Sequence, residues 1–144
     1  MKKNMSAKGG SAYGGNKVVI IMGSESDKDF VKKITDELSN LKVEFEENVA
    51  SAHKQPKEVL AILEDNEKGD DKIVYITIAG RSNALSGFCA ANTKFPVIAC
   101  PPFQDKDDFA VNINSTLQMP SNTPVLTVID PKNAALGAKK ILDL

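Results

Sequence analysis

The fold of this chain is set by the run Val18-Val19-Ile20-Ile21-Met22, which ends at Gly23-Ser24. A strand with one exposed face alternates apolar and polar residues, whereas this run is apolar throughout. It therefore predicts a strand buried on both faces, as in a parallel sheet covered by helices. The run Ile73-Val74-Tyr75-Ile76-Thr77-Ile78-Ala79 predicts a second strand of the same kind.

Segments with helical periodicity alternate with the strand-like runs. Apolar residues recur at three- and four-residue spacing between Phe30 and Leu41, which indicates an amphipathic helix. Pro56 stands where a first-turn proline belongs. The further expected strands are 43–49, 97–100 and 125–129, and the expected helices are 27–41, 56–67, 83–93, 109–117 and 133–142. We expect the charged stretches 64–72 and 105–108 to be solvated connections.

Alternating strands and helices indicate a parallel sheet with helices on both faces. Five strands predict the α/β class, with a flavodoxin-like doubly wound parallel sheet in a three-layer α/β/α single domain. We assign residues 17–144 to this domain. Residues 1–16 carry four glycines and three lysines without an acidic residue, and we expect a flexible tail there.

Composition narrows the possible functions. The chain has 144 residues, a formal net charge of −1 and a pI of about 5.8. Nucleic-acid-binding domains usually present a basic face, so we expect no nucleic-acid partner. No apolar run approaches the roughly 20 residues of a membrane span, and the N-terminus does not resemble a secretory signal. We expect a cytoplasmic protein with no membrane partner and with reduced cysteines.

Histidine occurs once, as His53, and tryptophan is absent. A single histidine excludes a two-histidine metal site, and Cys89 and Cys100 do not form a zinc motif. We expect no metal and no cofactor. A Ser-His-Asp triad would have to use His53 as its base.

The first strand is followed by Gly23, Ser24, Ser26 and Asp27. Ligands of parallel α/β sheets bind beyond the carboxyl ends of the strands. Hydroxyl groups and the free amides of a helix start bind anions, and a forward-pointing Asp27 would accept hydrogen bonds from two sugar hydroxyls. The alternative is an ordinary turn in which Ser26 or Asp27 caps the next helix.

The second strand is followed by Ser51-Ala52-His53-Lys54-Gln55-Pro56. A single histidine is more often a surface or structural residue than a catalytic one. This one follows a strand end, precedes a helix start and has a cation as its neighbour. Because histidine moves protons near neutral pH, we take His53 as a candidate proton carrier. Lys54 and Ser51 are candidate substrate ligands, with Lys54 suited to phosphate.

The third strand is followed by Gly80, Arg81, Ser82 and Asn83. Small residues, one cation and several donors fit a tight pocket for a carboxylate or carbonyl. The alternative is a helix start capped by Ser82 or Asn83. Cys100 ends the fourth strand, and we expect its thiol to be buried rather than reactive.

Three motifs in combination resemble the phosphoribosylaminoimidazole carboxylase family of purine biosynthesis. They are Met22-Gly23-Ser24-Glu25-Ser26-Asp27, Ser51-Ala52-His53-Lys54 and Ala79-Gly80-Arg81-Ser82-Asn83. Leu117-Gln118-Met119-Pro120-Ser121 and Asn133-Ala134-Ala135 fit the same family, and the resemblance extends from about Val18 to Leu142.

The resemblance implies roles for the first candidate residues. Ser24 and Ser26 would contact the phosphate end of the substrate, and Asp27 would hold the ribose hydroxyls. Lys54 replaces an arginine and would bind phosphate as a point charge rather than as a bidentate fork.

The resemblance also implies where the chemistry occurs. His53 would be the general acid/base. Ser82, with backbone amides near Gly80 and Arg81, would receive carbon dioxide or the product carboxylate. The implied partners are small molecules, aminoimidazole ribonucleotide and carbon dioxide, together with further copies of the chain in a homo-oligomer, an octamer by resemblance with a tetramer as the alternative.

The family has two branches. Class I members are mutases that move a carboxyl group from the exocyclic nitrogen to ring carbon four. Class II members add carbon dioxide directly to 5-aminoimidazole ribonucleotide, reversibly and without ATP or biotin. Mutases usually carry His-Arg-Thr-Pro, and an Ala-Ala-His-Leu-Pro-Gly run after the third strand. This chain instead has His53-Lys54-Gln55-Pro56 and Arg81-Ser82-Asn83-Ala84-Leu85-Ser86-Gly87, which resemble the direct carboxylase branch. We therefore expect a class II carboxylase. The alternatives are a class I mutase, a flavodoxin-like nucleotide-binding module and a structural subunit with a decayed site.

Overall fold

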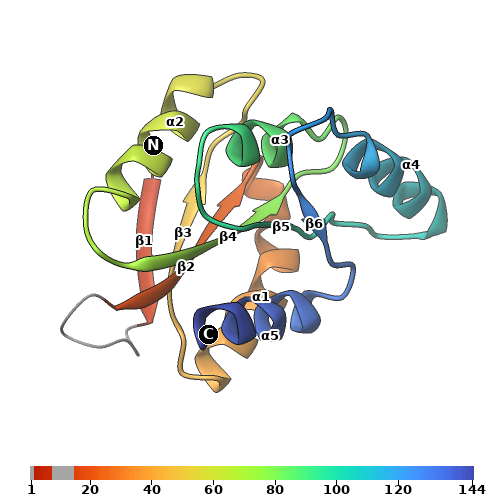
Figure 1. Cartoon of the computed structure of the whole chain (residues 1–144). Helices are drawn as coiled ribbons and strands as arrows, with labels where there is room; N and C mark the ends of the chain where they lie inside the picture. Colours follow the sequence, from red (N-terminus) through yellow and green to blue (C-terminus); the bar gives the residue numbers. More distant parts are fainter. Residues whose placement is uncertain (1, 8–14) are drawn as a thin grey trace.

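The computed structural model describes residues 2–7 and 15–144. A six-stranded sheet with the order β1-β3-β2-β4-β5-β6 forms its centre (Figure 1). The strands are β1 (Lys2–Ala7), β2 (Asn16–Met22), β3 (Glu44–Val49), β4 (Lys72–Ile78), β5 (Val97–Ala99) and β6 (Leu126–Thr127). Neighbouring strands are parallel except β1 and β3, which are antiparallel.

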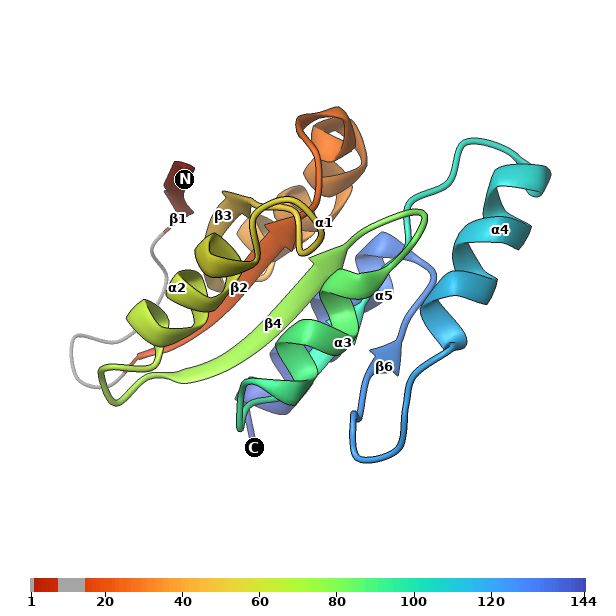
Figure 2. The same ribbon diagram turned by 90° about the horizontal axis from the view of Figure 1, so that it is seen from above.

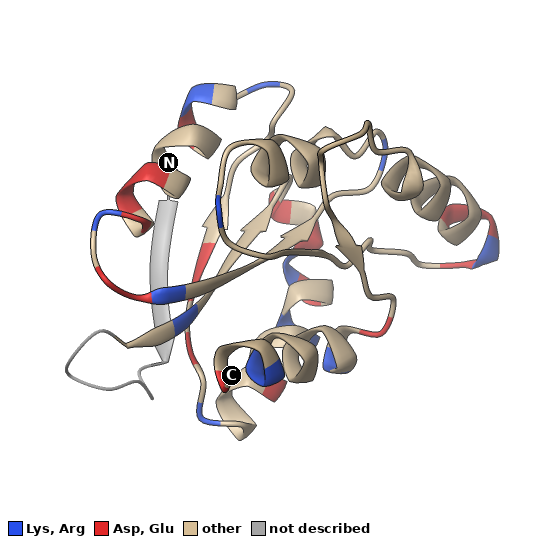
Figure 3. Cartoon of the chain, viewed as in Figure 1, with Lys and Arg blue, Asp and Glu red and all other residues tan. Residues whose placement is uncertain are grey.

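Helices cover both faces of the sheet, as Figure 2 shows from above. They are the 3₁₀ turn η1 (Glu25–Asp27) and the helices α1 (Lys28–Asn40), α2 (Pro56–Asn66), α3 (Ala84–Ala91), α4 (Lys106–Leu117) and α5 (Pro131–Leu142). Helices α1 and α5 pack on one face, and α2 and α3 pack on the other. Along α1 and α2, acidic and basic residues are interspersed on the outer surface (Figure 3).

The apolar run of β2 supplies both halves of the core. Val18 and Ile20 face α1 and α5, whereas Val19 and Ile21 face α2 and α3. Each of these four side chains is fully buried. Burial on both faces explains why the run has no polar alternation.

The five parallel strands confirm the predicted flavodoxin-like order. From β2 the chain crosses to β3 on one side, and from β3 it crosses back to β4 on the other side of β2. The direction of the connections therefore reverses at the carboxyl ends of β2 and β4, where ligand sites form in such sheets. Among the described residues, no helix has the length and apolar character required to cross a membrane.

The expected tail, residues 1–16, differs from the structure in part. Lys2–Ala7 forms β1, and β2 begins at Asn16. Residues 1 and 8–14 lie outside the described part of the chain. The edge of β3 carries backbone groups that a further strand can satisfy, and β1 pairs with them. Backbone pairing of this kind needs no apolar pattern, so the composition of the segment did not indicate it.

Two local expectations were wrong, the solvated connection at 105–108 and the cap by Ser26 or Asp27. The 105–108 stretch is the start of α4 rather than a solvated connection, because the Asp105 side chain accepts a hydrogen bond from the Asp108 amide at 2.8 Å and caps the helix. Asp27 occupies the N-cap position of α1 without a capping hydrogen bond. The capping oxygen of the preceding turn is that of Ser24, which accepts from the Ser26 amide at 3.2 Å.

Candidate active site

The ends of β2, β3 and β4 are joined by backbone hydrogen bonds that continue beyond the strands. The amide of Gly23 donates to the carbonyl of Ile78, and the amide of Ala50 donates to the carbonyl of Met22, both at 2.9 Å. These bonds bring the three following loops together around a cavity of about 230 Å³. Its lining residues are Gly23, Ser24, Asp27, Ser51, Ala52, His53, Lys54, Ala79, Gly80, Arg81, Ser82 and Leu85.

His53 and Ser82 meet in this cavity although they lie on different loops. The Nε2 atom of His53 is 3.2 Å from the Ser82 hydroxyl oxygen and 3.2 Å from the Ser82 carbonyl oxygen. The imidazole is solvent-exposed, so a ligand entering the cavity can reach it. The structure thus brings the proposed proton carrier to the proposed carboxyl-binding loop.

The Ser24 and Ser26 hydroxyls lie 2.8 Å apart at the tip of β2. Ser24 lines the His53 cavity, whereas Ser26 lines a neighbouring one. Asp27 lines both. Its partial burial, and then the charge of Asp108, raise the pKa of the Asp27 carboxyl above its usual value.

The loop after β3 is held in a tight turn by its own polar groups. The Ser51 hydroxyl accepts a hydrogen bond from the Lys54 amide at 3.2 Å, and the Ser51 carbonyl accepts one from the Gln55 amide at 2.7 Å. The Lys54 side chain is exposed at the cavity, and no ion pair forms between it and any residue the structure describes. Its ammonium group is therefore available to an anionic ligand.

Asn83 does not line the cavity with the other predicted residues. Its side-chain oxygen caps α3 by accepting from the Ser86 amide at 3.1 Å, and its side-chain nitrogen donates to Ser86 and Thr116 hydroxyls at 2.8 and 3.0 Å. Its own amide donates to the Ser115 hydroxyl at 2.6 Å. The geometry matches the alternative interpretation of this segment, a helix start capped by Asn83.

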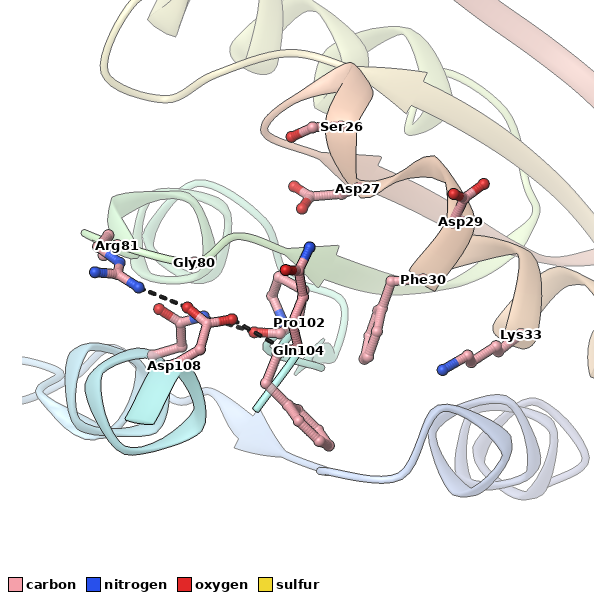
Figure 4. Close-up of a pocket in the computed structure, with 12 residues that line it drawn as sticks. Ser26, Asp27, Asp29, Phe30, Lys33, Gly80, Arg81, Pro102, Gln104 and Asp108 are labelled. Carbon is pink, nitrogen blue, oxygen red and sulfur yellow. Dashed lines mark hydrogen bonds and ion pairs between the residues drawn. The ribbon is translucent and has the colours of Figure 1, made fainter. Parts of the chain in front are cut away.

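A second cavity of about 360 Å³ adjoins the first and shares Asp27, Gly80 and Arg81 with it (Figure 4). Phe103 lies on its wall. The ring of Phe103 stands edge-on to the rings of Phe30 and Phe109, with centroids 6.1 and 5.2 Å away.

Arg81 points toward α4 rather than toward His53. Its Nη2 atom donates to Asp108 Oδ1 at 2.5 Å, as Figure 4 shows. This guanidinium, together with the Gln104 amide, holds the pKa of the Asp108 carboxyl below its usual value. Sequence reasoning missed Asp108, because its charged surroundings resembled a solvated loop. The signal that could have found it is the capping pattern of Asp105 and Asp108 ahead of an apolar stretch.

Neither cysteine lines the His53 cavity. Both are buried and free, which confirms the prediction for Cys100. Burial is the main cause that raises the pKa of each thiol, Cys89 and Cys100, to about 12. Cys89 packs between α3 and the sheet, and Cys100 packs on the face covered by α1 and α5.

A parallel α/β sheet with hydroxyls, a carboxyl, a lysine and a histidine around a cavity at its switch point is typical of an enzyme with a small-molecule site. Comparison with known proteins narrows this class further.

The model of the family described as AIR carboxylase matches residues 17–144. The phosphoribosylaminoimidazole carboxylase of Archaeoglobus fulgidus is 49% identical over 130 residues, which are 90% of this chain and 71% of that protein. A bifunctional phosphoribosylaminoimidazole carboxylase/phosphoribosylaminoimidazole succinocarboxamide synthetase of Drosophila melanogaster is 40% identical over 127 residues, 88% of this chain and 29% of that longer protein.

A crystal structure of Treponema denticola PurE has a similar fold, with a TM-score of 0.84 and 45% identity over 89% of this chain and 80% of that one. The chain therefore belongs to the AIR carboxylase family and has phosphoribosylaminoimidazole carboxylase activity in purine biosynthesis.

Proposed function

We propose that this enzyme adds carbon dioxide directly and reversibly to ring carbon four of 5-aminoimidazole ribonucleotide, without ATP or biotin. The observation that carries the proposal is the approach of His53 to Ser82 within one cavity that Asp27 and Lys54 also line. The reaction needs a proton carrier, a donor for the carboxylate and a cation for the phosphate. Residues of these three kinds would act together within one cavity.

Substrate binding is assigned to the tips of β2 and β3. Lys54 has no ion pair with a described residue, and we assign it to the substrate phosphate together with the Ser24 and Ser26 hydroxyls. Asp27 would accept hydrogen bonds from the ribose hydroxyls. The ring would then lie between His53 and Ser82.

The chemical step follows from the electron-rich aminoimidazole ring. Ring carbon four attacks carbon dioxide, so that a carbon–carbon bond forms and one C–O π pair moves to oxygen. The intermediate keeps its hydrogen on carbon four. His53 removes that proton, the C–H electron pair returns to the ring, and the aromatic product carries the new carboxylate. In decarboxylation the protonated imidazole delivers the same proton.

Positioning supplies much of the rate in this scheme. The Ser82 hydroxyl and the amides near Gly80 and Arg81 would hold the carboxyl group beside the ring. A small cavity would also keep water from the carbon dioxide.

The choice between carboxylase and mutase rests on the His53-Lys54-Gln55-Pro56 and Arg81-Ser82-Asn83 motifs. The test supplies 5-aminoimidazole ribonucleotide with bicarbonate in one assay and N5-carboxyaminoimidazole ribonucleotide in another, both without ATP. We expect product in the first assay with saturation at modest bicarbonate. Turnover of the N5-carboxylated nucleotide alone would identify the mutase and contradict the proposal.

We also propose that the enzyme acts as a homo-oligomer, an octamer or a tetramer, in the cytoplasm. Support comes from large apolar side chains left exposed on α4 and β6, where Val111, Leu117 and Leu126 are 45, 62 and 50% exposed. Such residues on neighbouring elements favour burial against another subunit. Light scattering coupled to size-exclusion chromatography tests this, and a monomer at micromolar concentration would contradict it.

A further inference from the structure

Arg81 stands on the boundary between the two cavities and lines both of them. Its side chain is 60% exposed, and its guanidinium donates to Asp108 at 2.5 Å. Among the residues that the structure describes, no second hydrogen-bond acceptor or carboxylate is paired with this guanidinium. Asp108 therefore determines where this charge lies (Figure 4).

Asp108 is itself held at two points. Its Oδ2 atom accepts a hydrogen bond from the Gln104 amide at 3.0 Å, and its own amide donates to Asp105 Oδ1 at 2.8 Å. Its side chain is 25% exposed, less than half the exposure of the arginine it binds. The first turn of α4 thus fixes the carboxylate, and the carboxylate holds the more exposed arginine.

We propose that Asp108 is a positioning residue that keeps the Arg81 guanidinium out of the phosphate-binding part of the His53 cavity. This inference rests on the proposed function, because it concerns how the same site receives a phosphorylated substrate. With Arg81 neutralised by Asp108, Lys54 is the cation of the His53 cavity that remains open to the phosphate. The backbone of Arg81 and Ser82 then faces the reacting carboxyl group.

An unrestrained guanidinium would disturb this arrangement. Arginine binds phosphates and carboxylates through two parallel hydrogen bonds, which a lysine cannot match. A free Arg81 would compete with Lys54 for the substrate phosphate and would retain the product carboxylate. Anions would then bind more tightly while turnover became slower.

The test compares Asp108→Asn with Asp107→Asn. The second variant is the control, because it removes an equal charge from the neighbouring residue, whose side chain is not bonded to Arg81. Calorimetry with inorganic phosphate measures the anion affinity of the cavity. We expect Asp108→Asn to bind phosphate about tenfold more tightly, with Asp107→Asn within about twofold of the wild type. The double variant Arg81→Ala/Asp108→Asn should bind phosphate no more tightly than the wild type does.

Kinetics supply a readout that a purely structural role would not give. Asp108→Asn should lower kcat about tenfold while KM for the nucleotide falls or stays constant, because the ground state is bound in the wrong place. Arg81→Ala alone should keep the wild-type phosphate affinity. If Asp108→Asn has a lowered melting temperature, the phosphate affinity of Arg81→Ala still tests whether the guanidinium is a direct phosphate ligand.

Two results would overturn the inference. One is an Asp108→Asn phosphate affinity and kcat equal to those of Asp107→Asn. The other is a large loss of phosphate binding in Arg81→Ala, which would make Arg81 a direct ligand. An inactive wild type would contradict the proposed function instead, and the phosphate measurements would still decide the role of Asp108.

Discussion

His53 Nε2 lies 3.2 Å from two oxygens of the same residue, the hydroxyl and the carbonyl of Ser82. A carbonyl oxygen only accepts hydrogen bonds, so it is a partner for Nε2 when this atom carries a proton. A hydroxyl both donates and accepts, so it remains a partner when the proton has left. The imidazole therefore has a partner in either protonation state, which suits a group that takes up and releases a proton.

Replacing Ser82 by alanine removes one of these two partners. Because the carbonyl stays, we expect Ser82→Ala to lower kcat by about tenfold rather than to abolish turnover. Ser39→Ala, an exposed position on α1, should leave kcat unchanged. Steady-state rates at saturating nucleotide and bicarbonate measure the effect. A Ser82→Ala enzyme with the wild-type kcat would remove Ser82 from the reacting centre.

Asp27 links substrate binding to pH. Burial and the charge of Asp108 raise the pKa of the Asp27 carboxyl. As the solution is acidified, Asp27 therefore takes up its proton at a higher pH than an ordinary aspartate does. If ionised Asp27 holds the ribose, KM should rise as the pH falls through this raised value. In Asp27→Asn, KM should rise about tenfold at neutral pH and lose this part of its pH dependence.

The same shift has a consequence for stability. The folded protein binds the Asp27 proton more tightly than the unfolded chain, so this group lowers stability as the pH rises from the ordinary aspartate value through the folded pKa. Asp27→Asn should therefore raise the melting temperature at neutral pH while it weakens nucleotide binding. Asp36→Asn on α1 serves as the exposed control. If the melting temperature and the nucleotide affinity of Asp27→Asn both fell, Asp27 would have a structural role, and its assignment as a ligand would be contradicted.

The cysteines should be chemically silent in the folded enzyme. With pKa values of about 12, each thiol is almost wholly protonated at pH 8, and the thiolate is the reactive form. A disulfide reagent at pH 8 should modify neither Cys89 nor Cys100 until denaturant is added. Cys100→Ala should keep kcat. Rapid native labelling together with loss of activity would favour a thiol mechanism instead.

Asn83 should matter for stability more than for binding. Removing its side chain leaves the Ser86 amide without its cap and takes one donor from the Thr116 hydroxyl, so Asn83→Ala should lower the free energy of unfolding by about 1–3 kcal/mol. KM should change less than twofold. Asn92→Ala, at the exposed end of α3, should cost less. Denaturant unfolding measures the stabilities, and an unchanged stability with a raised KM would show that Asn83 binds substrate.

The sheet and its helices could be predicted because each depends on local pattern. The buried runs of β2 and β4 are apolar at nearly every position, with Thr77 as the polar exception, and α1 has a periodic apolar stripe. The alternation of strands and helices predicts a parallel order, and in that order the loops after β2, β3 and β4 lie at the same edge of the sheet. That is why His53 and Ser82 could be expected in one cavity from their places in the chain.

The remaining contacts could not be predicted because they depend on the exact placement of distant segments. Arg81 and Asp108 are 27 residues apart, and only the folded chain brings α4 to the boundary of the cavities. Asn83 illustrates a second limit, since the same amide group serves a helix cap or a ligand equally well. Its neighbours Ser115 and Thr116, from another helix, decide between the two.

The central claim is that the single histidine moves the proton at ring carbon four. The most direct test is the comparison of wild type with His53→Asn, using bicarbonate and 5-aminoimidazole ribonucleotide without ATP, while nucleotide affinity is measured by calorimetry. We predict a loss of kcat of at least about a hundredfold, with the affinity within about threefold of the wild type. Near-normal turnover by His53→Asn would contradict the claim.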